Sequence, residues 1–340
     1  MRRHTPRGAA VATLGAMTLP LHTTATLASL LDEQARTLRA QLEGVYDGAV
    51  DAIHDARVAI RRVRELLALV PVVPGRDHED GVARNLKKIG RALGRVRDID
   101  VQLALIADLE HHTTQAAPAL VIVRRSYERE RLAKTRKLIK TLERLDVDEL
   151  LNRICDTHPR GLRKRLTSNG WRQLLEQLIG ERARNAGAAM VHARGVYFPN
   201  RAHGARIALK QLRYAAEIGA AIGVLDAAGA IKALRKGQDV LGDLHDRQTL
   251  ADALERHAGH DEIKAAHIAL AREVLEREVL QLHGDYLGRR AAVQEACSEI
   301  ERAACRPWLG RPHIVVGTAA VALSAILYGR HALASRAIEA

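Results

Sequence analysis

Two short runs of the sequence carry one histidine and three basic residues at the same spacing, HxxRxxx[RK]xxR. In a helix of about 3.6 residues per turn these four positions fall within an arc of roughly 80°, so all four side chains can face one ligand. The planar guanidinium group of arginine suits paired contacts to phosphate oxygens. The spacing therefore predicts two cationic helix faces that bind a polyanion, formed by His54, Arg57, Arg61 and Arg64 and by His203, Arg206, Lys210 and Arg213.

The overall charge favours the same class of ligand. Among 340 residues, 53 Lys and Arg stand against 40 Asp and Glu, for a formal charge of +13. Such a balance attracts nucleic acid, an anionic membrane or polyphosphate. Aromatic residues make up only 3% of the chain, which argues against recognition by base stacking. The composition therefore indicates that phosphate groups, more than bases, are recognised.

The cysteines and the N-terminal residues indicate the cellular compartment in which the protein is found. Cys155, Cys297 and Cys305 are odd in number and form no CxxC pair, so neither a disulfide framework nor a zinc site is indicated. The weak apolar stretch over residues 8–21 is interrupted by Pro20, and it does not have the form of a secretory signal. We therefore expect a cytoplasmic protein.

The elements that must position the cationic residues are helices. Around each run, small apolar residues recur at alternating spacings of three and four, which is typical of the buried seam of a helical bundle. Each cationic row follows its seam by one residue, or about 100° around the helix, so it should border the core. Because alternating strand patterns are missing, the sequence predicts an all-α fold. The two seams are Ile53, Ala56, Ile60, Val63, Leu67 and Val70, and Ala202, Ala205, Leu209, Leu212, Ala216 and Gly219.

A second pair of similar segments follows the two cationic runs. A Leu-basic-basic triplet begins at Leu86 and again at Leu234, and a Leu-Gly pair lies seven residues after each. The two copies are separated by 149 residues at the histidines (54 to 203) and by 148 residues at the glycines (94 to 242). This nearly constant offset predicts an internal duplication with about four helices in each half. The break between the halves is expected within residues 156–170, where Pro and Gly interrupt the helical pattern, and Pro71 and Pro74 should end the first motif helix.

Together, the two motif helices, the Leu-Gly-x-x-x-Asp segments and the duplication resemble the CHAD family, the conserved histidine α-helical domain. The resemblance covers residues 25–295, with a tail at 1–24 before it. It implies two four-helix bundles, about 25–155 and 170–295, related by a pseudo-twofold axis. It also implies that inorganic polyphosphate binds to a basic groove between the bundles. Residue by residue, it adds to the two cationic rows Lys87 and Lys88 in the first half and Arg235 and Lys236 in the second.

Some of the neighbouring residues have alternative roles. His54 and His203 either donate to phosphate once protonated or stay neutral and buttress a helix contact. The duplicated segments differ at Arg97 and His245, and the sequence leaves open whether either touches ligand. Asp98 and Asp246, which follow these two residues, are expected to pair with the cationic rows and hold the arginines in position.

Two rival functions remain open. The dyad of His245 and Asp246 looks like part of a metal-dependent phosphohydrolase site, but further ligands are missing, and the equivalent position holds Arg97. The chain also carries neither a P-loop nor an ExExK segment, so we expect no catalysis, no metal and no cofactor. The other rival is a nucleoid-type protein that binds the nucleic-acid backbone without reading bases.

The extension over residues 306–340 lies outside the resemblance. It holds an apolar segment, 314–328, bounded by Arg311 and Arg330. Fifteen helical residues would span about 22 Å, short of the roughly 30 Å hydrocarbon core of a bilayer. The segment is expected either to dock as a helix on this protein or a partner, or to anchor the chain to a membrane or granule surface. The expected location is the cytoplasm, in association with polyphosphate granules.

Overall fold

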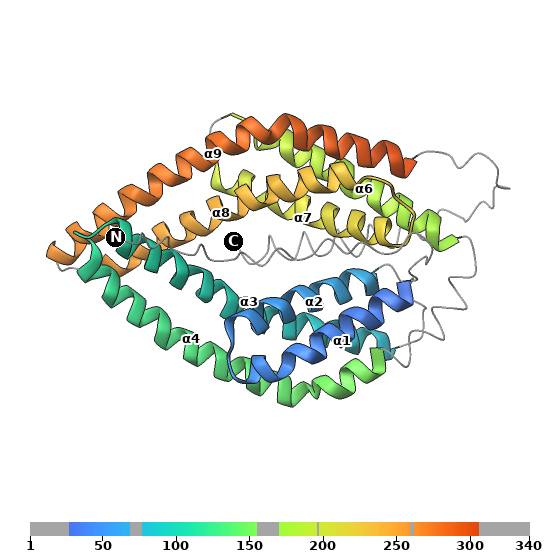
Figure 1. Cartoon of the computed structure of the whole chain (residues 1–340), viewed down its shortest axis with the longest axis horizontal. Coiled ribbons are helices and arrows are strands. Elements are labelled where there is room, and N and C mark those ends of the chain that lie inside the picture. Colours follow the sequence, from blue (N-terminus) through green and yellow to red (C-terminus); the bar gives the residue numbers. More distant parts are fainter. Residues whose placement is uncertain (1–26, 69–76, 155–169, 196, 259–261, 306–340) are drawn as a thin grey trace, which may run out of the picture.

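The computed structural model describes residues 27–68, 77–154, 170–195, 197–258 and 262–305, and all regular structure within them is α-helical (Figure 1). The predicted all-α fold is therefore confirmed. A short helical stretch at 147–154 follows the first four long helices. The long helices are α1 (Leu27–Tyr46), α2 (Val50–Ala68), α3 (Asp77–His112), α4 (Ala117–Leu145), α6 (Gly170–His192), α7 (Pro199–Ala221), α8 (Ala228–Ala258) and α9 (Glu262–Cys305).

The helices form two groups, α1 to α4 and α6 to α9, which lie one above the other in Figure 1. Within each group the helices that follow one another in the chain pack together, and α6 also packs against α9. Between the groups, α2 contacts α7, α3 contacts α8 and α4 contacts α9. In these three pairs a helix thus meets the one in the corresponding position of the other group, as expected for a pseudo-twofold arrangement. That the halves arose by duplication stays a prediction.

The predicted seams form the buried faces of the two motif helices. On α2, Ile53 and Val63 have no exposed surface, while on α7 the same is true of Leu209 and Leu212. Alanines fill the intervening positions, which lets neighbouring helices approach closely. Because the seams are buried, the register of both motif helices is determined, and so is the direction of the cationic row beside each seam.

The described part of α2 runs to Ala68, and that of α6 begins at Gly170. Val70, Pro71 and Pro74 lie outside the described residues, so the predicted end of the first motif helix and the predicted break within 156–170 stay predictions. Helix α9 continues to Cys305, beyond residue 295, at which the second bundle was expected to end. The tail at 1–24, the residues 155–169 and the extension at 306–340 with its apolar segment 314–328 lie outside the described residues. None of the described helices has both the length and the apolarity to cross a membrane.

An apolar cluster joins the two groups at the end where α3 and α4 meet α8 and α9, on the left in Figure 1. It takes residues from all four of these helices and is separate from the main core. Because its members come from both halves, their burial holds the halves together. The cluster consists of Ile106, Leu109, Ala116, Ala119, Leu120, Val123, Leu250, Ala251, Leu254, Ile268, Ala271 and Leu275.

A buried ion pair provides a second link between the groups. Arg182 of α6 is only 8% exposed and donates to Glu65 of α2 at 2.7 Å. The same nitrogen donates to the carbonyl oxygen of Gln211 on α7 at 3.1 Å. Removing Glu65 would leave the buried Arg182 without its ion pair, so the pair ties α6 and α7 to α2 in a defined arrangement.

The apolar cluster gives a direct test of how the halves are held. Leu250 is fully buried in it, and replacing this leucine by alanine should lower the free energy of unfolding by about 2–5 kcal/mol. Urea unfolding followed by circular dichroism measures the change. Leu280 on α9 is 65% exposed and serves as the control, because Leu280→Ala should change stability by no more than about 0.5 kcal/mol. Equal effects of the two substitutions would contradict the role of the cluster.

Candidate functional site

The two cationic rows lie along the border of the core, as their offset from the seams predicts. His54, Arg57 and Arg61 on α2 are half-buried, whereas Arg64 at the end of the row is exposed. All four members of the row on α7 are half-buried. These side chains are therefore partly shielded from water, which strengthens the electrostatic interactions among them.

The two rows are close enough in space to affect each other's ionisation. Burial lowers the pKa of Lys210 to about 7, and the cations Arg61 and Arg57 of the opposite helix contribute next. Burial, followed by Arg61, likewise lowers the pKa of Arg57. Burial also lowers the pKa of Arg206, with a smaller contribution from Arg61. We refer to Arg57, Arg61, Arg206 and Lys210 as the α2–α7 cation cluster. Its members come from both halves of the molecule and repel one another.

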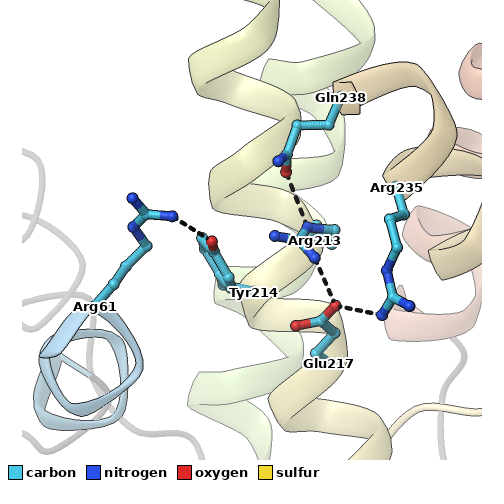
Figure 2. Close-up of polar contacts among 6 residues, drawn as sticks. All are labelled: Arg61, Arg213, Tyr214, Glu217, Arg235 and Gln238. Atoms are coloured by element: carbon cyan, nitrogen blue, oxygen red, sulfur yellow. Dashed lines mark hydrogen bonds and ion pairs between the residues drawn. The ribbon is translucent and has the colours of Figure 1, made fainter. Parts of the chain in front are cut away.

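A tyrosine between the halves holds two of the arginines (Figure 2). Arg61 donates to the hydroxyl oxygen of Tyr214 at 2.5 Å, and its guanidinium carbon lies 5.4 Å from the ring centroid. The guanidinium carbon of Arg213 lies 4.6 Å from the same centroid. Because Tyr214 is only 5% exposed, the ring offers both arginines a fixed, partly desolvated surface. Tyr214 thus orients Arg61 across the boundary between the halves.

Arg213 is held more tightly than the other members of its row. Its Nε donates to Gln238 at 2.9 Å, and a terminal nitrogen donates to Glu217 at 3.1 Å. The same Glu217 oxygen accepts a hydrogen bond from Arg235 at 3.1 Å (Figure 2). One carboxylate therefore serves two cations, which reduces the positive charge that Arg213 and Arg235 present to a ligand.

The aspartates that follow the Leu-Gly pairs lie close to the cluster. Asp98 forms an ion pair with Arg57 at 3.5 Å, as predicted, although its side chain is 73% exposed. Asp246 is half-buried, and burial raises its pKa while Arg206 acts in the opposite direction. Gln102 of α3 donates to the backbone carbonyl of Asp246 at 3.2 Å and so links the two halves at this point. The aspartates offset only part of the charge of the cluster.

The leading histidine of each row has a different neighbour in the two halves. The ring centroids of His203 and His245 are 4.8 Å apart, and burial, with Arg206 and His203, lowers the pKa of His245 to about 4. Burial and then Arg206 lower the pKa of His203, whereas burial and then Arg97 lower that of His54. Arg97 thus affects the ionisation of His54, whereas His245 packs its ring against His203. All three pKa shifts favour the neutral imidazole.

Comparison with known proteins places these features in a family. The model of the CHAD domain matches residues 29–255. The chain belongs to the CHAD family. Solved structures similar to this CHAD protein include the CHAD domain from the plant Ricinus communis, with 22% identity and a TM-score of 0.59 over 82% of this chain and 95% of that one. PptA from Streptomyces chartreusis is also similar, with 18% identity and a TM-score of 0.54 over 80% of this chain and 98% of that one. At these identities the two structures show the shared fold, and no curated protein matches the sequence significantly.

The four basic residues that the resemblance added to the two rows do not gather at one place in the CHAD protein. Lys88 and Lys236 are exposed, and Lys87 is half-buried. Lys236 lines a pocket between α8 and α9, whereas its neighbour Arg235 reaches Glu217 on α7. Of the twelve predicted site residues, the electrostatic interactions therefore group the four of the α2–α7 cation cluster most clearly.

No set of three or more histidine, cysteine, aspartate or glutamate residues in the described part of the chain is arranged to hold a metal ion. His245, one member of the proposed dyad, packs against His203, and a carboxylate contributes only the last and weakest influence on its pKa. The geometry around the dyad is therefore that of two imidazole rings in contact, tilted by 50° and influenced by Arg206.

Sequence reasoning did not identify Tyr214, Glu217 and Gln238 as part of the site. Tyr214 directly follows the last residue of the second cationic row and is one of six tyrosines in the chain. In a chain so poor in aromatic residues, a tyrosine adjoining the row was the one available signal. Its contact with Arg61, 153 positions away, follows only from the packing of α2 against α7.

The depressed pKa of Lys210 leads to a prediction about the stability of the unliganded protein. Because the pKa is about 7 in the folded state against an ordinary 10.5, burying this charge destabilises the fold fully below pH 7. This cost declines as the pH rises toward 10.5, where the unfolded chain also loses the proton. Lys210→Met should therefore raise the melting temperature by about 2–4 °C or more at pH 6, and the gain should shrink by pH 10. Differential scanning calorimetry measures both values.

The exposed Lys140 on α4 supplies the matched control. Lys140→Met removes the same charge without relieving a buried cation, so it should leave the melting temperature nearly unchanged at either pH. A destabilised Lys210→Met protein at pH 6 would show that the cation cluster does not strain the fold.

Proposed function

We propose that this CHAD protein binds inorganic polyphosphate where α2 and α7 meet, without catalysing a reaction. The observation that carries the proposal is the α2–α7 cation cluster. Four partly buried cations from two helices interact unfavourably, and Asp98 is the only carboxylate within the described residues that forms an ion pair with one of them. An anion that enters this cluster relieves the repulsion, so part of the binding energy is already present in the free protein.

A linear chain of phosphates suits a cluster of this composition. Each phosphate adds negative charge and acceptor oxygens along a thin, flexible chain, and Arg57, Arg61 and Arg206 offer guanidinium groups that form paired, charge-assisted hydrogen bonds. Displaced counterions add a favourable term that weakens as salt increases. Membership of the CHAD family, through the resemblance in its motifs, supports the same ligand.

Two unpaired polar atoms, one in the cluster and one on the leading histidine of the same row, also support ligand binding. Nδ1 of His203 and Nε of Arg206 are buried and have no hydrogen-bond partner among the described residues. Unpaired buried polar groups are costly, so a ligand oxygen that reaches them is favoured. A polyanion raises the pKa of nearby imidazoles, and His54 and His203 would then become cationic donors in the complex.

The proposal assigns a positioning role to the residues around the cluster. Tyr214 directs Arg61, and Glu217 with Gln238 directs Arg213. Arg64, Lys87, Lys88, Arg235 and Lys236 would contribute long-range attraction more than direct contacts. We place this binding activity in the cytoplasm, at polyphosphate granules.

Charge reversal within the cluster tests the site. The variant with Arg57, Arg61, Arg206 and Lys210 all replaced by Glu should retain its helicity but bind long-chain polyphosphate at least about a thousandfold more weakly, because several charge-assisted contacts are lost. Calorimetry at two salt concentrations, with duplex DNA and pyrophosphate as comparators, measures the effect. Parent protein should bind polyphosphate with a steep salt dependence and in preference to DNA at equal phosphate concentration.

The control for this variant changes three exposed basic residues of α4. Replacing Arg136, Lys137 and Lys140 by Glu alters a similar amount of charge away from the cluster, and the affinity should change by only a few fold. If both variants lost the same amount of affinity, the effect would be due to net charge and not to the cluster. Tighter binding of DNA by the parent protein would favour the nucleic-acid function instead.

Binding should also depend on pH through Lys210. Its pKa is about 7 in the free protein and must rise when a polyanion binds, so binding above pH 7 takes up a proton. Affinity should therefore fall between pH 7 and 9, by at most about tenfold per pH unit from this group. Lys210→Arg keeps the charge throughout this range and should flatten the profile. Calorimetry in buffers of different ionisation enthalpy counts the protons, and an equal uptake by the parent and Lys210→Arg would rule out Lys210 as their source.

A further inference from the structure

A second basic site lies between α8 and α9. These helices enclose a pocket of about 370 Å³ that is open to solvent on one side. Basic and small apolar side chains alternate along its walls, and none of its residues belongs to the α2–α7 cation cluster. The lining residues are Gly229, Lys232, Ala233, Lys236, Arg289, Ala292 and Val293.

Two glycines of α8 explain why the pocket is present. A β-carbon at Gly237 would lie 2.6 Å from a methyl carbon of Val293, so glycine allows α8 and α9 to approach closely beneath the pocket. A β-carbon at Gly229, in contrast, would have no other side chain within 4 Å. Because Gly229 lies in the first turn of α8, its missing side chain leaves the pocket open at the N-terminal end of this helix, where the helix dipole is positive.

Three cations converge on this opening. Lys232 and Lys236 are one helical turn apart on α8 and lie on the same face, and Arg289 reaches the pocket from α9. Within the described part of the chain, none of the three has a hydrogen bond or ion pair to its side chain. By comparison, Arg213 and Arg235 nearby share Glu217. The charge in the pocket is therefore available to a ligand.

We propose that the pocket between α8 and α9 binds a short, compact oligophosphate. Three cations and the positive end of α8 match a ligand with several negative charges, and the pocket volume falls within the range for small ligands. The floor of Ala233, Ala292 and Val293 offers no acceptor that would repel phosphate oxygens. The ligand is either a free oligophosphate or the end of a longer chain, since both present the same groups.

This site goes beyond the proposed function, because it uses residues other than the α2–α7 cation cluster and can be removed separately. Binding of a long chain at both places would raise its overall affinity, provided that the chain can span them. A ligand too short to span them would occupy each place independently. Tripolyphosphate therefore serves as the probe for the pocket.

Calorimetry with tripolyphosphate on the full chain tests the proposal. One variant replaces Lys232, Lys236 and Arg289 by Gln, and a second, Gly229→Leu, fills the opening without changing charge and with a better helix former. Each should lose one bound tripolyphosphate per chain, or bind it at least about tenfold more weakly. The control replaces Arg136, Lys137 and Lys140 on α4 by Gln and should bind like the parent. Circular dichroism verifies that all variants stay helical, and Gly229→Leu remains informative if the triple variant does not fold.

Several results would overturn the proposal. The first is an unchanged stoichiometry and affinity of tripolyphosphate binding in both pocket variants. The second is an equal loss of binding in the α4 control. The third is a loss of binding in the charge variant but none in Gly229→Leu. The last result would place the ligand on the lysines outside the pocket. If the α2–α7 cation cluster itself does not bind phosphate, the parent should bind one tripolyphosphate and the pocket variants none, so the two proposals fail separately. Repeating the titration with long-chain polyphosphate then distinguishes a free oligophosphate from a chain end.

Discussion

Cations of the two halves repel one another where α2 meets α7, and the other contacts between the halves must offset this repulsion. Lys210 of one half lies among Arg57 and Arg61 of the other, and burial weakens the screening that water would provide. Such a boundary would separate without other contacts. The apolar cluster at the ends of α3, α4, α8 and α9 and the buried pair of Arg182 and Glu65 hold the halves together instead. The contacts that hold the halves together and the concentrated positive charge thus lie in different parts of one interface.

The residues around the cluster moderate this repulsion without removing it. Asp98 pairs with Arg57 of the cluster, and Glu217 pairs with Arg213 and Arg235 outside it. Among the described residues, no carboxylate forms an ion pair with the other three members of the cluster. Tyr214 contributes no formal charge at neutral pH, but its ring and hydroxyl hold Arg61 in a fixed orientation. Preorganised side chains lose less conformational entropy when a ligand binds. Under the proposed function, repulsion among the half-buried cations would lower the stability of the free protein, and binding of an anion would relieve it.

Much of the fold could be predicted because helical periodicity is a local property. The alternation of apolar residues around Ile53 and Leu209 predicts both the helices and their buried faces, and the position of each cationic row follows from geometry alone. The pairing of Asp98 with a cationic row was also predicted, and the structure shows Arg57 as its partner. The roles of Arg64 and Lys236 were harder to assign. Arg64 lies at the exposed end of its row, and Lys236 is directed toward α9 by the packing of α8 between two neighbours.

Residues within a few turns of one another were sufficient to predict the helices, the buried seams and the two cationic rows, because each of these features is local. Only the tertiary structure decided which cations act together, because the approach of Lys210 to Arg57 and of Tyr214 to Arg61 depends on how α2 meets α7. The pocket at Lys236 and Arg289 likewise depends on the close packing that Gly237 allows against Val293. Such contacts join residues more than 50 positions apart. They are selected by the burial of whole helix faces, which no local pattern in the sequence records.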